Sequence, residues 1–173
     1  MEKRSMEALG RLTVEGFKAA EKRPVVLILD NIRSGLNIGS IFRTADAFAL
    51  SRLILCGITA QPPHREILKT ALGSTESVDW EWMESTAEAV TRLKNEGYKV
   101  YAIEQTSEPI WLNEFVMDNT PHAFILGNEV DGVGEEALKL CDGAIEIPQF
   151  GTKHSLNVAV AAGIVVWTVS IYE

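Results

Sequence analysis

Residues 25–48 read VVLILDNIRSGLNIGSIFRTADAF, and this stretch decides the fold class. The run VVLILD has no polar alternation, which is typical of a strand that is covered on both faces of a parallel sheet. Apolar residues then recur at helical spacing from Ile38 to Phe48 and predict a helix over 38–48 with one buried side. A buried strand that leads directly into an amphipathic helix indicates an α/β domain.

The same alternation continues to the end of the chain. Apolar or β-branched runs between breaker residues predict five more strands, at 52–56, 78–83, 98–104, 122–127 and 144–147. Helical patterns lie between and after them, at 64–72, 84–95, 134–141 and 155–171. We therefore predict a mostly parallel sheet flanked by helices. Residues 24–173 show no repeat, linker or low-complexity tract, so we expect a single domain there.

Residues 1–23 predict an N-terminal helical extension that ends before Pro24. Four of its apolar residues could bury one face: Met6, Leu9, Leu12 and Phe17. The extension lacks the continuous apolar core of a signal peptide. The longest apolar stretch of the chain, residues 156–167, is shorter than the about 20 residues that a membrane-spanning helix needs. We expect a cytoplasmic protein with no membrane partner.

Charge and cysteine content limit the possible functions. The net charge of −8 taken alone argues against a polyanion as partner. Residues 1–70, however, hold 11 Lys and Arg against 7 Asp and Glu, whereas residues 71–173 hold 5 against 17. A basic patch for nucleic acid and an ordinary solvated surface therefore both remain open. Cys56 and Cys141 form no CxxC or Cys/His cluster, so we expect neither a metal site nor a disulfide framework.

Ligands of open α/β sheets bind beyond the carboxyl ends of the strands, which makes the loop after the first strand a place to search. Here Asn37 is a candidate N-cap, and Arg43 shares a helix face with Gly39. The missing side chain at Gly39 would leave room above the guanidinium for a phosphate, which arginine binds with two parallel hydrogen bonds. The residues alone are compatible with an anion site and with a capped helix that has an exposed arginine.

Two later loops also carry polar residues at strand ends. Gly127 would let another group approach the main chain closely, while Glu129 and Asp131 fit either a site or the start of the next helix. Further along, Ser155 is a candidate N-cap, and Asn157 falls in a first helical turn, where unpaired N–H groups carry partial positive charge.

Three stretches together resemble the ordered motifs of the SpoU/TrmH family of RNA ribose 2′-O-methyltransferases, in the SPOUT superfamily. They are NIGSIFRTADAF (37–48), ILGNEVDGV (125–133) and IPQFGTKHSLNVAVAAGI (147–164). The resemblance implies an α/β-knot fold, in which the SPOUT methyltransferase domain at 24–173 ends in a deep trefoil knot. It also implies a homodimer that transfers a methyl group from S-adenosyl-L-methionine to a ribose 2′-OH of structured RNA, with tRNA favoured over rRNA.

The resemblance assigns site residues by motif position. Five polar residues match catalytic positions of the family: Asn37, Arg43, Glu129, Ser155 and Asn157. Six residues match cofactor contacts: Glu104, Gln105, Gly127, Ile147, Ser155 and Leu156. Gln149 departs from the pattern, because the family most often has Met there, but the change removes no polar group that the reaction needs.

Two other functions compete with this one. A catalytically silent RNA-binding module could keep the fold, although it would have no need of all five polar positions. A small-molecule methyltransferase would suit the acidic net charge. If the substrate is RNA, seven basic residues are the candidates for binding it: Lys3, Arg4, Arg11, Lys18, Lys22, Arg23 and Arg33.

Overall fold

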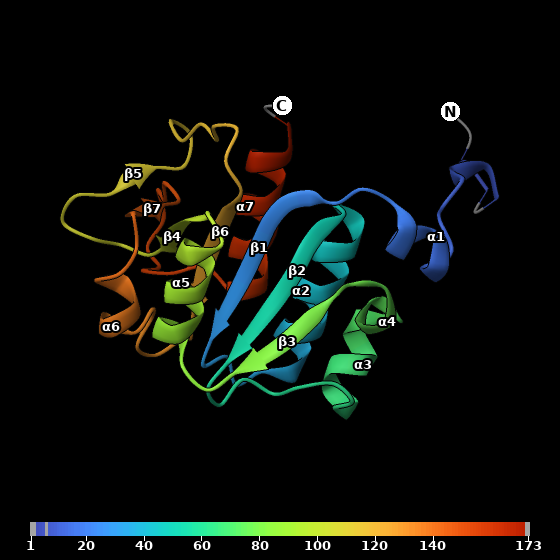
Figure 1. The fold of residues 1–173 in the computed structure, drawn as a ribbon. Coiled ribbons are helices and arrows are strands. Elements are labelled where there is room, and N and C mark those ends of the chain that lie inside the picture. The colour runs from blue at the N-terminus through green and yellow to red at the C-terminus, as the bar shows by residue number, and fades with distance from the viewer. Residues whose placement is uncertain (1–2, 6, 172–173) are drawn as a thin grey trace.

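A parallel sheet forms the centre of the computed structural model, which describes residues 3–5 and 7–171 (Figure 1). Within these residues, seven strands lie in the order β3-β2-β1-β6-β4-β7-β5, and all neighbours run parallel. The strands are β1 (Arg23–Asp30), β2 (Leu50–Cys56), β3 (Trp80–Met83), β4 (Lys99–Ile103), β5 (Ile110–Trp111), β6 (His122–Gly127) and β7 (Gly143–Glu146). The predicted α/β class is confirmed, and all six predicted strands are present.

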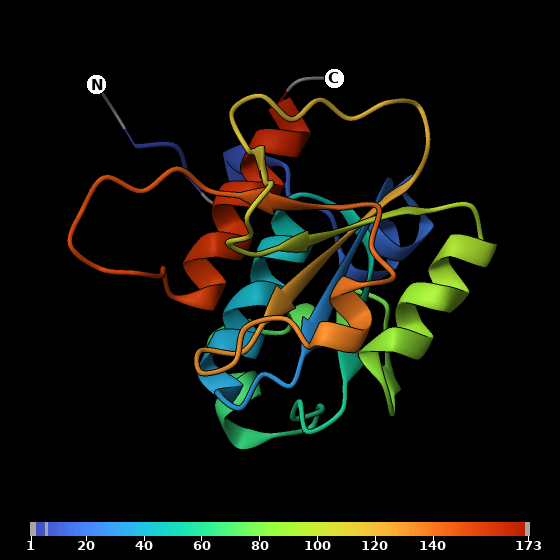
Figure 2. The same ribbon diagram turned by 90° about the vertical axis from the view of Figure 1, so that its left-hand side faces the viewer.

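Helices cover both faces of the sheet (Figure 2). On one face α2 (Gly35–Ala47) packs against α7 (Val158–Ile171), with α3 (Arg65–Ala71) and α4 (Ser74–Ser77) beside α2. On the other face lie α5 (Thr86–Asn95) and α6 (Glu135–Leu138). The helices predicted around 38–48, 64–72, 84–95, 134–141 and 155–171 are therefore all found, with shifted ends.

Strand β1 explains why its sequence has no polar alternation. It lies between β2 and β6, and every residue from Val25 to Asp30 is buried. Leu27 and Leu29 pack in the apolar cluster beneath α2 and α7, while Val26 and Ile28 pack in the cluster beneath α5. Both faces of the strand thus lose contact with water, and its carboxyl end is held at the middle of the sheet edge.

The N-terminal extension is helical in two short pieces and not along its length. A 3-10 helix, η1 (Glu7–Leu9), is followed by α1 (Val14–Ala19). Gly10 has a positive φ of 58°, and the Thr13 hydroxyl accepts a hydrogen bond from the Gly16 N–H (3.1 Å), so a new helix starts after the break. The predicted apolar face is wrong for Leu9 and Leu12, which are exposed, and right for Phe17, which is buried; Met6 lies outside the described residues.

The predicted open space at Gly39 is also wrong. Gly39 is buried against α3, where an added Cβ would lie 2.3 Å from the Ile67 carbonyl oxygen and 2.2 Å from the Thr70 hydroxyl oxygen. The glycine therefore serves the close approach of two helices and offers no room for an anion. Helical spacing identified the face but not the neighbour that fills it.

Strand β5 was not predicted, because its two residues are both exposed and too few to show a period. It pairs with β7, with Ile110 opposite Ile145 and Trp111 opposite Glu146. Of the helices that the structure describes, none has both the length and the apolar character required to cross a bilayer.

The packing at Gly39 gives a test of the fold. Alanine is favoured over glycine inside a helix by about 1 kcal/mol, yet Gly39→Ala should lower the free energy of unfolding by about 1–3 kcal/mol, because its methyl group collides with the backbone of α3. Chemical denaturation measures the change. Ser40→Ala, next to it on α2, is the matched control and should stay within about 0.5 kcal/mol of the wild type. A Gly39→Ala protein more stable than the wild type would contradict this packing.

Candidate functional site

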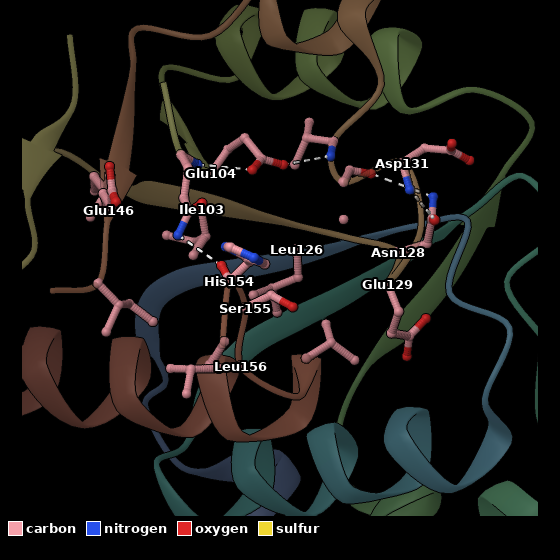
Figure 3. Close-up of a pocket in the computed structure, with 18 of the residues that line it drawn as sticks. Ile103, Glu104, Leu126, Asn128, Glu129, Asp131, Glu146, His154, Ser155 and Leu156 are labelled. Atoms are coloured by element: carbon pink, nitrogen blue, oxygen red, sulfur yellow. Dashed lines mark hydrogen bonds between the residues drawn. The ribbon is translucent and has the colours of Figure 1, made fainter. Parts of the chain in front are cut away.

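A cavity of about 570 Å³ lies beyond the carboxyl ends of β4, β6 and β7 (Figure 3). Its walls come from three loops, those after β4, β6 and β7, and from the first turns of α7. This is the edge of the sheet at which the sequence predicted ligand binding. The cavity is within the 300–1,000 Å³ that is usual for sites of small molecules and cofactors.

The loop after β6 is shaped by Asn128, a residue that the sequence analysis missed. Its side-chain oxygen accepts hydrogen bonds from the N–H groups of Val130 (3.0 Å) and Asp131 (2.9 Å), and its backbone bonds in both directions to Gly132 (3.1 and 3.2 Å). An asparagine directly after a strand with a glycine four positions later is a turn signal that could have identified it.

Gly127 permits a close approach to the main chain, as predicted, but the approaching group is this same loop. An added Cβ at Gly127 would lie 2.1 Å from the carbonyl carbon of Gly132 and 2.3 Å from the nitrogen of Val133. The loop therefore folds back onto the end of β6. As a result, backbone groups of the loop face the cavity.

Glu104 and Gln105 hold the loops together. The Glu104 carboxylate accepts hydrogen bonds from the N–H groups of Val133 (3.0 Å) and Gln105 (2.8 Å). The Gln105 amide donates to the carbonyl oxygen of His154 (3.0 Å). The strand end at β4 is thereby bonded to the loop after β6 and to the loop after β7, and both residues also line the cavity.

Asp30, at the end of β1, is hydrogen-bonded to the loop after β6. It is 2% exposed, and its carboxylate accepts hydrogen bonds from the Thr86 hydroxyl (2.6 Å), the Asn31 amide (2.8 Å) and the Gly134 N–H (2.8 Å). The sequence signal that could have identified Asp30 as a site residue is a single acidic residue at the end of an apolar strand. Because these donors satisfy the buried carboxylate, Asp30 is a structural anchor for the end of the loop after β6.

Three of the predicted catalytic residues form a continuous hydrogen-bond chain. Asn157 donates from its amide to the Asn37 side-chain oxygen (3.1 Å), and Asn37 donates from its amide to Glu129 (2.8 Å). The chain links the starts of α2 and α7 to the loop after β6. It lies beside the cavity, because Glu129 lines it.

The helix caps differ from the predictions. Ser34, not Asn37, caps α2 by accepting a hydrogen bond from the Asn37 N–H (3.3 Å). Asn157, not Ser155, caps α7, because its side-chain oxygen accepts from the N–H groups of Ala159 (2.9 Å) and Val160 (3.4 Å). Each helix thus starts three residues away from the predicted position. The Asn37 side chain is left free to bridge.

Arg43 does not join the other predicted catalytic residues. It lies six positions after Asn37, which is about 9 Å along the axis of α2. It is exposed and lines a separate cavity of about 420 Å³ together with Lys69 and Phe48. Among the described residues it has no hydrogen-bond or ion-pair partner. Within one chain, the structure brings four of the five residues together and leaves out Arg43.

The predicted cofactor contacts all line the large cavity: Glu104, Gln105, Gly127, Ile147, Ser155 and Leu156. Gln149 lines it as well. Figure 3 shows Glu104, Glu129, Asp131 and Glu146 around the cavity, and the described residues of its lining include no lysine or arginine. The lining is therefore negatively charged and favours a positively charged ligand.

Neither cysteine is among the residues that line the large cavity. Burial raises the pKa of the Cys56 thiol to about 12 and the pKa of Cys141 to about 11. Both thiols remain protonated at neutral pH, and only the thiolate is a good nucleophile.

Comparisons with known proteins identify the family of this chain. The sequence matches the SpoU rRNA methylase family over residues 24–167. It is 32% identical over 142 residues to the 23S rRNA (guanosine-2'-O-)-methyltransferase RlmB of Neisseria meningitidis serogroup B. The matched region covers 82% of this chain and 56% of that relative. The chain thus spans little more than half the length of that curated relative.

Two solved structures are similar over most of this chain. The A. aeolicus TrmH/SpoU tRNA modifying enzyme has a TM-score of 0.78 and 26% identity, with 90% of this chain and 77% of that chain covered. An AdoMet-bound rRNA methyltransferase from Sinorhizobium meliloti has a TM-score of 0.78 and 28% identity, with 86% and 56% covered. Because the family match extends from the start of β1 into the last turns of α7, the chain belongs to the SpoU rRNA methylase family.

Proposed function

We propose that this chain transfers a methyl group from S-adenosyl-L-methionine to a ribose 2′-OH of structured RNA. The observation that carries the proposal is the large cavity, which is lined by all six predicted cofactor contacts and by the predicted catalytic residues Glu129 and Ser155. Two more predicted catalytic residues, Asn37 and Asn157, are joined to Glu129 by hydrogen bonds. The RlmB relative is named a guanosine-2'-O-methyltransferase of 23S rRNA, and the Sinorhizobium meliloti relative contains AdoMet, which supports both the reaction and the cofactor.

The residues of the cavity fit this cofactor. Leu126, Ile147 and Leu156 offer apolar walls for an adenine ring, and the loop after β6 presents backbone groups for hydrogen bonds. The carboxylates of Glu129 and Asp131 give the negative charge that a sulfonium and an ammonium group require. Bound there, S-adenosyl-L-methionine would supply a methyl group already activated by the positive charge on sulfur.

The protein must then position the ribose and manage the proton of its 2′-OH. The Ser155 hydroxyl has no hydrogen bond to the described part of the chain, and Glu129 uses only one carboxylate oxygen to hold Asn37. Both groups are therefore available to orient the 2′-OH, while Asn37 and Asn157 fix Glu129. Orientation of this kind can supply about 7–11 kcal/mol of the barrier.

Arg43 serves in this proposal as a phosphate ligand and as a stabiliser of the developing alkoxide, not as the base. An arginine pKa above about 12 makes a neutral guanidinium costly at neutral pH. The proton acceptor is the neighbouring phosphate, water or another group. We retain RNA in general as the substrate class, because the named relatives include both an rRNA and a tRNA enzyme and give the expected preference for tRNA no support.

We propose a homodimer that shares this site. Exposed apolar side chains follow one side of α7 at helical spacing, namely Val160, Trp167 and Ile171. On the neighbouring α2, Leu36 and Arg43 lie on its solvent-facing side. A second copy packed on this face would cover the apolar residues and bring an Arg43 to the boundary between the two chains.

We also propose the deep trefoil knot. After β7 the chain must cross the carboxyl ends of β4 and β6 to reach α7, which packs on α2. The hydrogen bond from Gln105 to His154 supports a crossing close against the segment that follows β4. An experimental structure in which residues 147–157 pass outside that segment would exclude the knot.

The basic N-terminal residues are weaker candidates for RNA binding than the sequence suggested. The Lys22 ammonium donates hydrogen bonds to the carbonyl oxygens of Phe17 and Ala20 (2.8 Å for Ala20) and lies over the Phe17 ring. Arg4 donates to the Ala8 carbonyl oxygen (2.7 Å). Both side chains are thus partly used in holding the extension together.

Arg43→Ala should abolish methyl transfer and leave affinity for S-adenosyl-L-methionine within a few fold, because Arg43 lies outside the cofactor cavity. Transfer of a labelled methyl group to total tRNA, rRNA and metabolites measures the first effect and identifies the acceptor; calorimetry measures the second. Lys139→Ala, an exposed basic residue elsewhere, should behave as the wild type. Full turnover by Arg43→Ala would remove its assigned role, and a lack of cofactor binding by the wild type would favour the silent module.

Asn157 has two functions that substitutions can separate. Asn157→Ala removes the cap of α7 and should cost about 1 kcal/mol of unfolding free energy as well as activity. Asn157→Asp keeps a capping acceptor but cannot donate to Asn37, so it should unfold like the wild type and still lose most of its turnover. Thermal denaturation and methyl transfer on the same preparations give both quantities. Turnover of Asn157→Asp at the wild-type level would show that the bridge to Asn37 is dispensable.

The dimer proposal predicts that Val160→Glu yields monomers, because a carboxylate on this face would be buried by the second copy. Sedimentation equilibrium measures the mass, and far-UV circular dichroism checks the fold. Val116→Glu places the same charge at another exposed valine and should leave the mass unchanged. A wild-type protein that is monomeric at micromolar concentration would contradict the proposal.

A further inference from the structure

A second cavity adjoins the proposed cofactor cavity. It measures about 430 Å³ and shares Gln105, Glu146, Gln149 and His154 with the larger one. Its outer part is formed by the loop after β7 and by the β5 edge of the sheet. The proposed reaction, as described above, uses none of the residues of this outer part.

Two aromatic side chains at this cavity are exposed to solvent. Phe150, in the loop after β7, is 97% exposed, and Trp111, on β5, is 40% exposed. The pairing of Trp111 with Glu146 places the Trp111 backbone beside this cavity, because β5 and β7 are held in register. A phenylalanine left almost wholly in water lacks the stabilisation that burial of its ring would give, and a bound partner that covers the ring would supply it.

The polar groups at the same cavity indicate the chemistry of that partner. Asn113 and Gln149 contribute amides, which can pair with the edges of a nucleobase. Lys153 lines the cavity too, is exposed and has no ion-pair partner in the described part of the chain. Aromatic faces, amides and one free cation match the flat ring, the polar edge and the phosphate of a single nucleotide.

We propose that this second cavity binds one unpaired base of the RNA substrate, stacked on Phe150 and Trp111, beside the ribose that is methylated. This inference rests on the proposed function. Because Gln105 and His154 belong to both cavities, the stacked base and the cofactor would be neighbours. The acceptor is then a single-stranded or flipped-out nucleotide, since a base inside a duplex cannot present its face to the two aromatic rings.

Binding of short single-stranded RNA tests the proposal without requiring the natural substrate. The probes are a decamer of adenosine and an abasic decamer with the same ribose-phosphate chain. Wild-type protein should bind the adenosine decamer more tightly, and Phe150→Ala should weaken that binding by about 5-fold to 150-fold, the range found for loss of one base–aromatic stack. Binding of the abasic decamer should not change.

Two further variants separate stacking from charge. Phe150→Trp should retain the preference for the decamer with bases, because an indole also stacks. Phe150→Ala should leave the dependence of affinity on salt unchanged, whereas Lys153→Ala should reduce its slope by about 0.7, the contribution of one phosphate contact on a single strand. Val116→Ala removes another exposed apolar side chain and should have no effect. Equal binding of both decamers by the wild type would overturn the proposal.

Methyl transfer and cofactor binding distinguish this inference from the function on which it rests. Phe150→Ala should raise KM for RNA by a similar factor and leave kcat and the Kd for S-adenosyl-L-methionine within about 2-fold. A selective loss of cofactor affinity would assign the aromatic pair to the adenine of the cofactor, and a change in oligomeric mass would assign it to the second subunit; either result overturns the proposal. If the wild type neither binds cofactor nor methylates RNA, the proposed function fails while the decamer experiment still decides whether the cavity binds bases.

Discussion

The hydrogen bond from Asn157 to Asn37 is the interaction on which the layout of the site depends. It joins the first turns of α2 and α7, whose sequences are far apart, and the bond from Asn37 to Glu129 extends the connection to the loop after β6. The Asn157 amide therefore performs two tasks: its oxygen caps α7, while its nitrogen bonds α7 to Asn37 at the start of α2. A polar residue at the start of an otherwise apolar helix is explained by this double use.

The loops around the cavity are held by polar side chains bonded to backbone groups. Glu104 binds the Val133 N–H, Asp30 binds the Gly134 N–H, and Asn128 closes the turn between them and β6. Gly127 allows this, because any side chain there would push the loop away from the strand. Ordinary loops expose their backbone to water, whereas here internal partners fix it, and a fixed backbone can present hydrogen-bonding groups to a ligand without further ordering.

The features that could be predicted from the sequence are those that leave a distinctive pattern of residues. Strand β1 was recognised because both of its faces are buried, and the site loops were located because parallel strands direct their carboxyl ends to one edge. The two-residue β5 has no period to recognise. The predicted starts of α2 and α7 are wrong by three residues, because several nearby polar residues could each act as a cap. The open space predicted at Gly39 is wrong because helical spacing defines a face of the helix but not the element that packs on it. The family resemblance assigns the site residues, but only the structure reveals the bridging role of Asn37.

The distribution of charge explains how an acidic chain could act on RNA, the substrate class proposed above. The cavity is lined by carboxylates, which suit a cationic methyl donor but would repel a phosphate. Arg43 stands outside it on α2, and Lys153 stands outside it on the loop after β7. In the proposed reaction the RNA backbone would therefore stay at these basic margins, while only the neutral ribose hydroxyl approaches the acidic interior. The net charge of the chain describes neither the acidic cavity nor its basic margins. The short separation between these negative and positive regions is what would orient the nucleotide.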